Sequence, residues 1–497
     1  MAHMISQARA LPRRILGGGA AGDAGVAGRR RIVSNVAVQL VSRVIMMALS
    51  VITVSLAART LHPTGYGVWN GVSAFVGLFG VLTSLGFTTA ATQRMAAEPE
   101  REGQWLGALV VTRTCLSIVT VVICAVCVPL FLSDAHDAHL VAFIMIATIP
   151  LAGAAALTTV FETRLRAGLL SFLNVLQSLI WLAIVLGLAL TKGSVVAFAV
   201  ADTALLVLMT AIQVSVTRRF AHVDWRAGMK LWRSLARTAV PLAIAGLAIS
   251  IYWQLDSVLL LQLGGPRESG LYGAAYGFLS PLTFLPAAVM STLFPVMAAV
   301  HGRDPARSRR LVQMGADAMA VLALPILAGT IALSGPIVHL LYGNEFQRAA
   351  GLLPILMLAF VSICYGSLAG YLAPVIGKQW RLATFSAIGA VANIALNVLL
   401  IPPYGAYGSA WATVVTELLT MIPMLSTSLR TLRIRLVPWR MLRTLALAAA
   451  MTGVMVLARP LGLFPAGLIG VLFYAAGLLA LRIVNWQELR AMRALRA

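Results

Sequence analysis

The stretch RRRIVSNVAVQLVSRVIMMALSVITVSLAA, residues 29–58, decides the fold class. Three arginines precede an apolar run that contains a single charge, Arg43. A helix needs about 20 apolar residues to cross the hydrocarbon core of a bilayer, and this run is long enough. It is too long for the apolar part of a signal peptide and leads directly into further apolar segments. It therefore predicts an uncleaved first transmembrane helix.

Thirteen more apolar segments follow, and connections are short throughout. The fourteen predicted spans are residues 33–58, 66–91, 106–132, 140–160, 169–190, 195–216, 239–264, 272–298, 311–334, 350–372, 382–401, 407–428, 441–458 and 466–484. The chain is 60% hydrophobic and 11% charged, with a mean hydropathy of +0.90. A soluble protein is roughly 45–50% apolar. We therefore predict an all-α integral membrane protein.

Positive charge is distributed unevenly along these segments. With the N-terminus in the cytoplasm, 31 of the 38 Lys and Arg residues fall on the cytoplasmic side, two lie within spans, and five fall outside: Arg59, Lys192, Arg267, Arg348 and Arg459. Such a bias sets orientation in the membrane, and an odd number of spans would destroy it. We expect both termini to lie in the cytoplasm. The net charge of +22 then indicates contact with anionic inner-leaflet lipids, and not with nucleic acid.

An internal repeat predicts two similar halves. Residues 63–69 (PTGYGVW) and 266–272 (PRESGLY) share the pattern Pro-x-x-x-Gly-aliphatic-aromatic at an offset of six spans. Six is even, so the halves would have the same orientation, as in several transporter folds. The predicted organisation is a disordered basic tail (1–31), an N-lobe (32–216), a cytoplasmic amphipathic linker (217–238), a C-lobe (239–428), two extra helices (429–484) and a cytoplasmic tail (485–497).

Polar residues inside the spans are the candidate functional residues. A charge at mid-membrane costs at least about 2.5–3.5 kcal/mol, so it usually faces protein or a wet cavity. Arginine binds phosphate through two parallel hydrogen bonds, and amides suit sugar hydroxyls. The candidate substrate-binding residues are Arg43, Arg113, Gln39, Gln254 and Asn397, and the candidate ion-coupling residues are Asp256 and Glu417.

Other uses of the same residues stay open at this point. Arg113 is close enough to the cytoplasmic interface to extend its charge into it, and amides in spans more often join helices. The two carboxylates could carry protons or balance the arginines. We expect no catalytic residue, no metal and no cofactor, with H⁺ or Na⁺ as the coupling ion.

Several short motifs resemble a known family. They are Leu61 to Trp69, Asp256 followed by 264–276 (GGPRESGLYGAAY), Phe294-Pro295, and 403–410 (PYGAYGSA). The chain resembles polysaccharide flippases of the Wzx type, within the MOP superfamily that also holds MATE exporters and the lipid II flippase MurJ. The resemblance spans about residues 30–484. It implies two six-helix lobes around a central cavity, two extra helices, and alternating access.

The resemblance also implies a substrate and partners. The substrate would be an undecaprenyl-pyrophosphate-linked oligosaccharide, moved from the inner to the outer leaflet of a bacterial inner membrane. The protein partners would be a polysaccharide polymerase and chain-length machinery. The cationic residues of MurJ-like members in the second and eighth helices are missing, which makes lipid II a less suitable substrate. The alternatives are a MATE-like multidrug or lipid II exporter and a membrane-embedded polymerase or glycosyltransferase.

Overall fold

The computed structural model describes residues 21–84, 86–132, 137–163, 167–219 and 223–481, and within them every regular element is helical. The helices are α2 (Ala21–Leu82), α3 (Phe87–Ala97), α4 (Glu102–Phe131), α5 (Ala138–Ile146), α6 (Leu151–Ala155), α7 (Thr159–Thr163), α8 (Ala167–Leu190), α9 (Val195–Arg218), α10 (Trp225–Leu259), α11 (Gly265–Leu282), α12 (Phe284–Val300), α13 (Pro305–Tyr342), α14 (Leu352–Val375), α15 (Gln379–Tyr404), α16 (Ala406–Leu432), α17 (Pro438–Ala458) and α18 (Leu463–Ala480). The predicted all-α fold class is confirmed.

In the described part of the chain, eleven helical segments are long and apolar enough to cross a membrane, or twelve if the bent pair α5 and α6–α7 forms one span. Two of these segments, Val41–Leu82 with 42 residues and Gln254–Val300 with 47 residues, are each long enough for two crossings. The count of fourteen stays a prediction: it requires that each of these two segments crosses twice and that the bent pair is one span.

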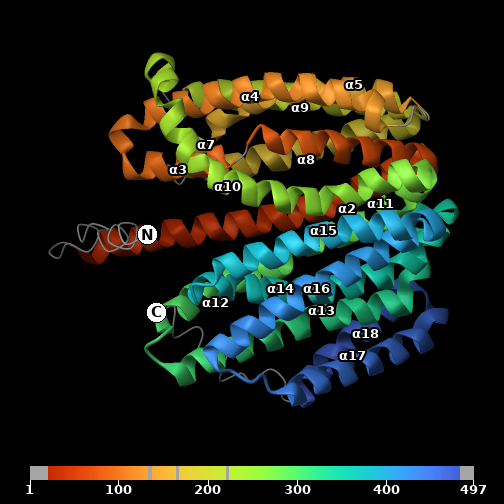
Figure 1. The fold of residues 1–497 in the computed structure, drawn as a ribbon. Helices are drawn as coiled ribbons and strands as arrows, with labels where there is room; N and C mark the ends of the chain where they lie inside the picture. The colour runs from red at the N-terminus through yellow and green to blue at the C-terminus, as the bar shows by residue number, and fades with distance from the viewer. Residues whose placement is uncertain (1–20, 85, 133–136, 164–166, 220–222, 482–497) are drawn as a thin grey trace.

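Both long segments turn back at one end of the bundle. Within α2, His62 has φ 56° and ψ 170°, and Pro63 follows. In Figure 1, α3 lies at the same end as the start of α2, so the chain reverses inside α2. The second segment has a matching turn, because Gly265 has φ 83° and α11 lies at the far end from α12 (Figure 1). Pro63 suits the first turn because a proline has no N–H to donate to the preceding helical turn. Gly265 suits the second because glycine tolerates positive φ.

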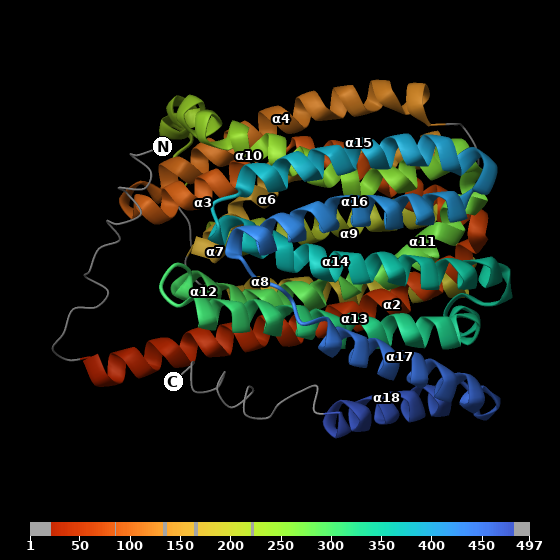
Figure 2. The same ribbon diagram turned by 60° about the horizontal axis from the view of Figure 1, so that its bottom comes forward.

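The helices form two bundles with a pair of helices on one side. In Figure 1, α3 to α9 form the upper bundle with the second half of α2, and α11 to α16 form the lower one. The first half of α2 runs between them and is counted with the upper bundle, into which it continues. We call these the N-lobe and the C-lobe. The first turns of α10 pack against α4 in the N-lobe and its end against α15 in the C-lobe, so α10 joins the two. Helices α17 and α18 pack on α13 at the outer side of the C-lobe (Figure 2).

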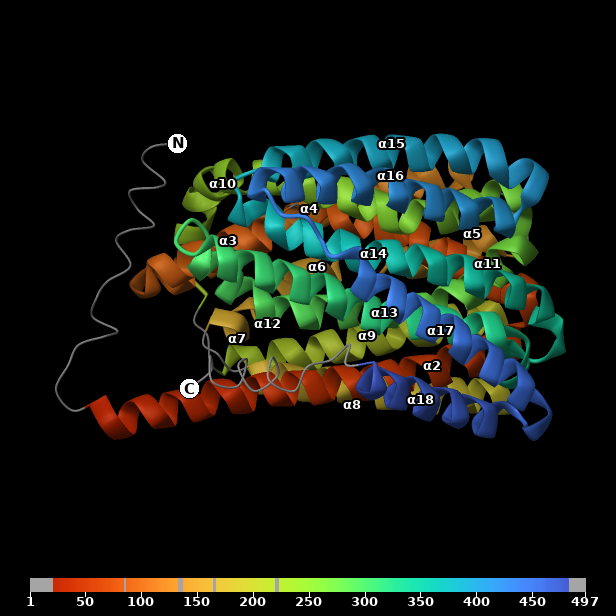
Figure 3. The ribbon, with the colours of Figure 1, turned by 90° about the horizontal axis from the view of Figure 1, so that it is seen from below.

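Basic residues collect at one end of the bundle, which we call the basic end. The connections α9–α10, α12–α13 and α16–α17 lie there (Figure 3) and carry Arg218, Arg226, Arg303, Arg307 and Arg433. The turns at His62 and Gly265 lie at the opposite end. The connections that the sequence shows to be rich in Lys and Arg and those that are poor in them therefore lie at opposite ends of the bundle.

The two copies of the sequence repeat pack directly against each other. A Cβ atom at Gly67 would overlap the carbonyl oxygen of Pro266, and a Cβ at Gly270 would overlap the carbonyl oxygen of Pro63. The Ser269 hydroxyl also donates to the Gly67 carbonyl at 3.2 Å. These contacts are reciprocal between equivalent positions, as expected at a local twofold axis. The repeat therefore marks the place where the lobes meet.

The predicted disordered tail needs a correction. Helix α2 begins at Ala21, so residues 21–31 are helical. Extending an existing helix gains one hydrogen bond for each residue and avoids the cost of nucleation, which offsets the low helix propensity of the three glycines in this stretch. Residues 1–20 and 482–497 lie outside the described part. In the predicted linker, residues 225–238 are the first turns of α10 and are continuous with the seventh predicted span.

We predict that Gly67→Ala and Gly270→Ala each destabilise the protein by about 1–3 kcal/mol, the usual cost of overpacking a tight contact. Gly80→Ala in the same helix is the matched control, since nothing lies within 4 Å of its Cβ position. The control should be neutral or slightly stabilising, because alanine favours helix by roughly 0.5–1 kcal/mol. Thermal unfolding in detergent measures the difference, and equal melting temperatures for Gly67→Ala and Gly80→Ala would contradict the contact.

Candidate substrate cavity

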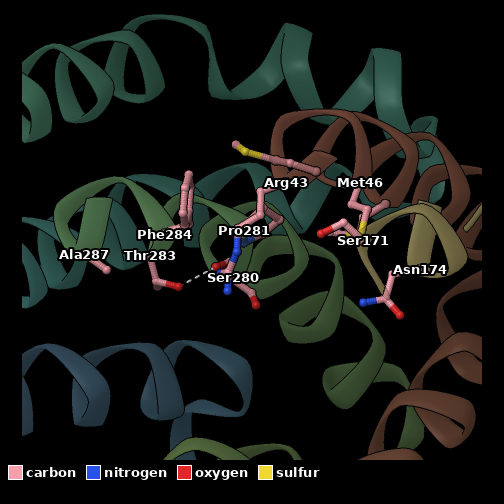
Figure 4. Close-up of a pocket in the computed structure, with 11 residues that line it drawn as sticks. Arg43, Met46, Ser171, Asn174, Ser280, Pro281, Thr283, Phe284 and Ala287 are labelled. Carbon is pink, nitrogen blue, oxygen red and sulfur yellow. Dashed lines mark hydrogen bonds between the residues drawn. The ribbon is translucent and has the colours of Figure 1, made fainter. Parts of the chain in front are cut away.

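A cavity of about 640 Å³ lies between the two lobes. The N-lobe wall comes from α2 and α8, and the C-lobe wall comes from the end of α11 and the start of α12 (Figure 4). Its lining residues are Arg43, Met46, Met47, Ser50, Ser171, Asn174, Ser280, Pro281, Thr283, Phe284 and Ala287. Hydroxyl, amide and guanidinium groups therefore share one chamber with apolar side chains.

Arg43 is the charged residue in this lining. Its side chain is exposed, and its guanidinium carbon lies 5.1 Å from the centre of the Phe284 ring. A cation over an aromatic face is attracted by about 0.5–1 kcal/mol at an exposed site. Arg43 belongs to the N-lobe and Phe284 to the C-lobe, so this weak contact crosses the cavity and leaves the N–H groups of the arginine available to a ligand.

The C-lobe wall is shaped by a helix break. Helix α11 ends at Leu282 and α12 begins at Phe284, with Pro281 in the last turn of α11. Proline removes a helical hydrogen bond and disturbs the preceding turn. The Thr283 hydroxyl donates to the Ser280 carbonyl at 2.7 Å at this break (Figure 4). The proline-rich eighth predicted span is therefore interrupted where it faces the cavity.

Asp256 occupies a different environment, a buried polar cluster inside the C-lobe. Its carboxylate accepts hydrogen bonds from Tyr272 Oη at 3.1 Å, from Thr413 Oγ1 at 3.0 Å and from Asn397 Nδ2 at 2.8 Å. The donors come from α11, α16 and α15, and Asp256 is only 5% exposed. The cluster thus ties four helices together around one carboxylate.

Some hydrogen-bond acceptors in this cluster receive no hydrogen bond. Among the described residues, the buried oxygens Asn393 Oδ1, Asn397 Oδ1 and Ser409 Oγ have no hydrogen-bond partner. A buried acceptor without a donor costs about 1–3 kcal/mol. Unsatisfied oxygens beside a carboxylate are the groups that bind a hard cation.

The structure brings two of the sequence-predicted residues together, Asp256 and Asn397, and sets the others apart. Arg113 Nη1 donates to Thr88 Oγ1 at 3.3 Å within the N-lobe. Gln254 packs against α2, because its side-chain oxygen occupies the space that a Cβ at Gly77 would need. Glu417 is buried on α16. Gln39 lies in α2, and its side chain is outside the described residues.

Sequence reasoning missed several members of both sites. Phe284 and Ser171 in the cavity are ordinary membrane-helix residues, and nothing local distinguishes them. Tyr272 and Thr413 had a weak signal: Tyr272 ends the repeat motif, and Thr413 lies four residues before Glu417 on one helix face. Their hydrogen bonds to Asp256 join helices that are far apart in the sequence.

With a membrane-helix bundle, paired repeats and an interlobe cavity established, comparison with known proteins identifies the family. Residues 32–301 match the family described as polysaccharide biosynthesis protein. The chain belongs to this family. The predicted resemblance is thereby confirmed.

Two curated relatives of this polysaccharide biosynthesis protein come from Haloferax volcanii. It is 29% identical to "Probable flippase AglR" over 175 residues, 34% of this chain and 37% of that protein's length. It is 20% identical to "Probable low-salt glycan biosynthesis flippase Agl15" over 357 residues, 72% of this chain and 75% of the relative. Both relatives are named as probable flippases.

The fold also matches a solved transporter. The lipid II flippase MurJ, in an inward closed conformation, superimposes with a TM-score of 0.73 over 90% of this chain and 98% of MurJ. The sequence identity is 15%, so the likeness concerns the fold alone. The predicted likeness to the MurJ fold is confirmed.

We predict that Thr413→Val destabilises this polysaccharide biosynthesis protein by about 1–3 kcal/mol, since it removes a donor from a buried carboxylate. Thr416→Val is the control: Thr416 is also buried on α16, but its hydroxyl donates only to the Ala412 carbonyl of its own helix, at 2.7 Å. Thermal unfolding in detergent should show a lower melting temperature for Thr413→Val. Equal values would show that the bond to Asp256 contributes nothing.

Proposed function

We propose that this protein is a flippase for lipid-linked oligosaccharides and that it works by alternating access. The observation that carries the proposal is the cavity between two pseudo-symmetric lobes, with Arg43 at its wall. The names of the relatives support transport over an enzymatic role. The ligand class follows from the lining, because a guanidinium suits a pyrophosphate, and Ser171, Asn174 and Ser280 suit sugar hydroxyls.

The proposed substrate is an undecaprenyl-pyrophosphate-linked oligosaccharide. Its headgroup would occupy the cavity while its polyprenyl tail stays in the bilayer, since only the headgroup pays a large penalty for entering hydrocarbon. Arg43 would bind the pyrophosphate in place of Phe284. A pair of charge-assisted hydrogen bonds is stronger than a single cation–π contact, so the ligand would displace the ring.

We further propose the orientation in the membrane. The basic end would face the cytoplasm and anionic inner-leaflet lipids, because positive charge resists translocation. The substrate would then move from the inner to the outer leaflet of a bacterial inner membrane. A polysaccharide polymerase and chain-length machinery, which use such substrates, are the proposed protein partners.

Asp256 is the proposed coupling residue. The carboxylate and the unsatisfied oxygens of Asn393, Asn397 and Ser409 would accept Na⁺, and a proton on Asp256 is the other candidate. Either cation would neutralise a buried charge in the C-lobe. Because Tyr272 belongs to α11, which also contacts α2, a change at Asp256 would reach the interface between the lobes.

We expect Arg43→Ala to reduce flipping of a polyprenyl-pyrophosphate-linked oligosaccharide at least tenfold in proteoliposomes. A charge-assisted hydrogen bond contributes about 1.5–3 kcal/mol, which corresponds to roughly a 10- to 150-fold change. Arg43→Lys should be intermediate, since lysine keeps the charge without the planar fork. The control is Arg267→Gln, which changes an exposed arginine outside the cavity, beside the turn at Gly265. Unchanged flipping by Arg43→Ala would remove Arg43 from the binding site.

Cation coupling predicts that wild-type flipping slows when an imposed Na⁺ or proton gradient is collapsed. Asp256→Asn should remove this dependence, because asparagine keeps the size of the side chain and loses the charge. Glu417→Gln tests the other predicted coupling residue in the same assay. Flipping by the wild type that is indifferent to both gradients would exclude coupling at either carboxylate.

A further inference from the structure

The C-terminal end of α13 is held by residues of the other lobe. The last four carbonyls of a helix have no partners within the helix. Arg59 of α2 donates from Nε to the Leu341 carbonyl at 2.8 Å and from Nη2 to the Leu340 carbonyl at 2.5 Å, and the Ser55 hydroxyl also donates to Leu341. A cation at a helix C-terminus is favoured by the helix dipole as well.

A second contact joins the same two regions one turn further along. His62 Nδ1 lies 2.6 Å from Glu345 Oε2. His62 is the residue at which α2 turns back, and Glu345 lies three residues beyond the end of α13 at Tyr342. Helices α2 and α13 run beside each other in Figures 2 and 3. Arg59 and His62, one helical turn apart in the N-lobe, therefore both contact the same C-lobe segment, residues 340–345. We call this segment the corner.

Another ion pair at this end is different in kind. Arg348 Nη1 pairs with Glu268 Oε1 at 2.9 Å, and Glu268 also accepts from the Ala406 N–H at 3.0 Å. All three residues belong to the C-lobe. This pair stabilises one lobe, whereas the Arg59 contacts connect two.

We propose that Arg59 is a positioning residue for transport: it forms a lock that holds the lobes together at the end opposite the basic end, and the lock opens in each cycle. The inference deepens the proposed alternating-access function and rests on it. Arg59 is exposed, so water can take over both the guanidinium and the freed carbonyls when the lobes separate. Such a bond opens and closes at little cost, as a gate requires.

The lock can be tested by labelling the cavity from outside. A reporter is Ser280→Cys on the cavity wall, in a background where the four native cysteines are replaced by alanine. A membrane-impermeant maleimide is added to intact cells. Arg59→Gln should raise the labelling rate several-fold over the parent, because the lobes separate more often at the outer end. Arg59→Lys should label close to the parent rate, since an ammonium can still bind the α13 carbonyls.

Arg348→Gln is the matched control, because it removes an exposed arginine contact that lies within one lobe. It should leave the labelling rate unchanged. Equal labelling of Arg59→Gln and the parent, or an equal increase with Arg348→Gln, would overturn the lock. If Arg59→Gln is too unstable to study, His62→Gln weakens the same corner and should also raise labelling; no increase there would overturn the lock.

The labelling assay separates this inference from the proposed function. It uses no glycolipid, so increased labelling with Arg59→Gln would support the lock even if the protein failed to flip a polyprenyl-pyrophosphate-linked oligosaccharide. Conversely, if the wild type flips the oligosaccharide normally but Arg59→Gln labels at the parent rate, the lock is rejected and the proposed function stands.

Discussion

The contact between the two repeat turns sets the geometry of the whole molecule. Gly67 and Gly270 let the backbone of each turn touch the carbonyl of the other turn's proline, a distance that any side chain would prevent. Because the partners are equivalent positions, the contact relates the lobes by an approximate twofold axis. The cavity between α2, α8, α11 and α12 lies between the two lobes that this contact joins.

The charged groups in the membrane divide into two chemical environments. Arg43 is exposed in a cavity and its guanidinium lies over an aromatic face, so its N–H groups can donate to a ligand. Asp256 is buried and already accepts three hydrogen bonds. A flexible cation in open space suits a substrate that comes and goes, whereas a carboxylate fixed by four helices suits a small ion that changes how those helices pack. This difference underlies the separate roles proposed for the two residues.

The predicted site was only partly recoverable from the chain. Arg43 was found because a charge in the middle of an apolar run has few explanations other than a wet or protein-lined interior. The same logic selected Arg113 and Gln254, yet these side chains contact Thr88 and Gly77 and do not line the cavity. Depth in the membrane can be counted along a helix, but the direction of a side chain around the helix axis depends on neighbours that hydropathy does not describe.

The sequence by itself determined the all-helical membrane class, the separation of basic from charge-poor connections, and the positions of the paired turns. Each of these depends on the length, hydropathy or charge of individual segments and on how such a segment interacts with the bilayer. Only the tertiary structure decided that Phe284 faces Arg43, that Thr413 and Asn397 surround Asp256, and that Arg59 caps α13. Each of those contacts joins residues more than 140 positions apart, and it arises because helices distant in the sequence pack together, within the C-lobe or between the lobes, which no local pattern specifies.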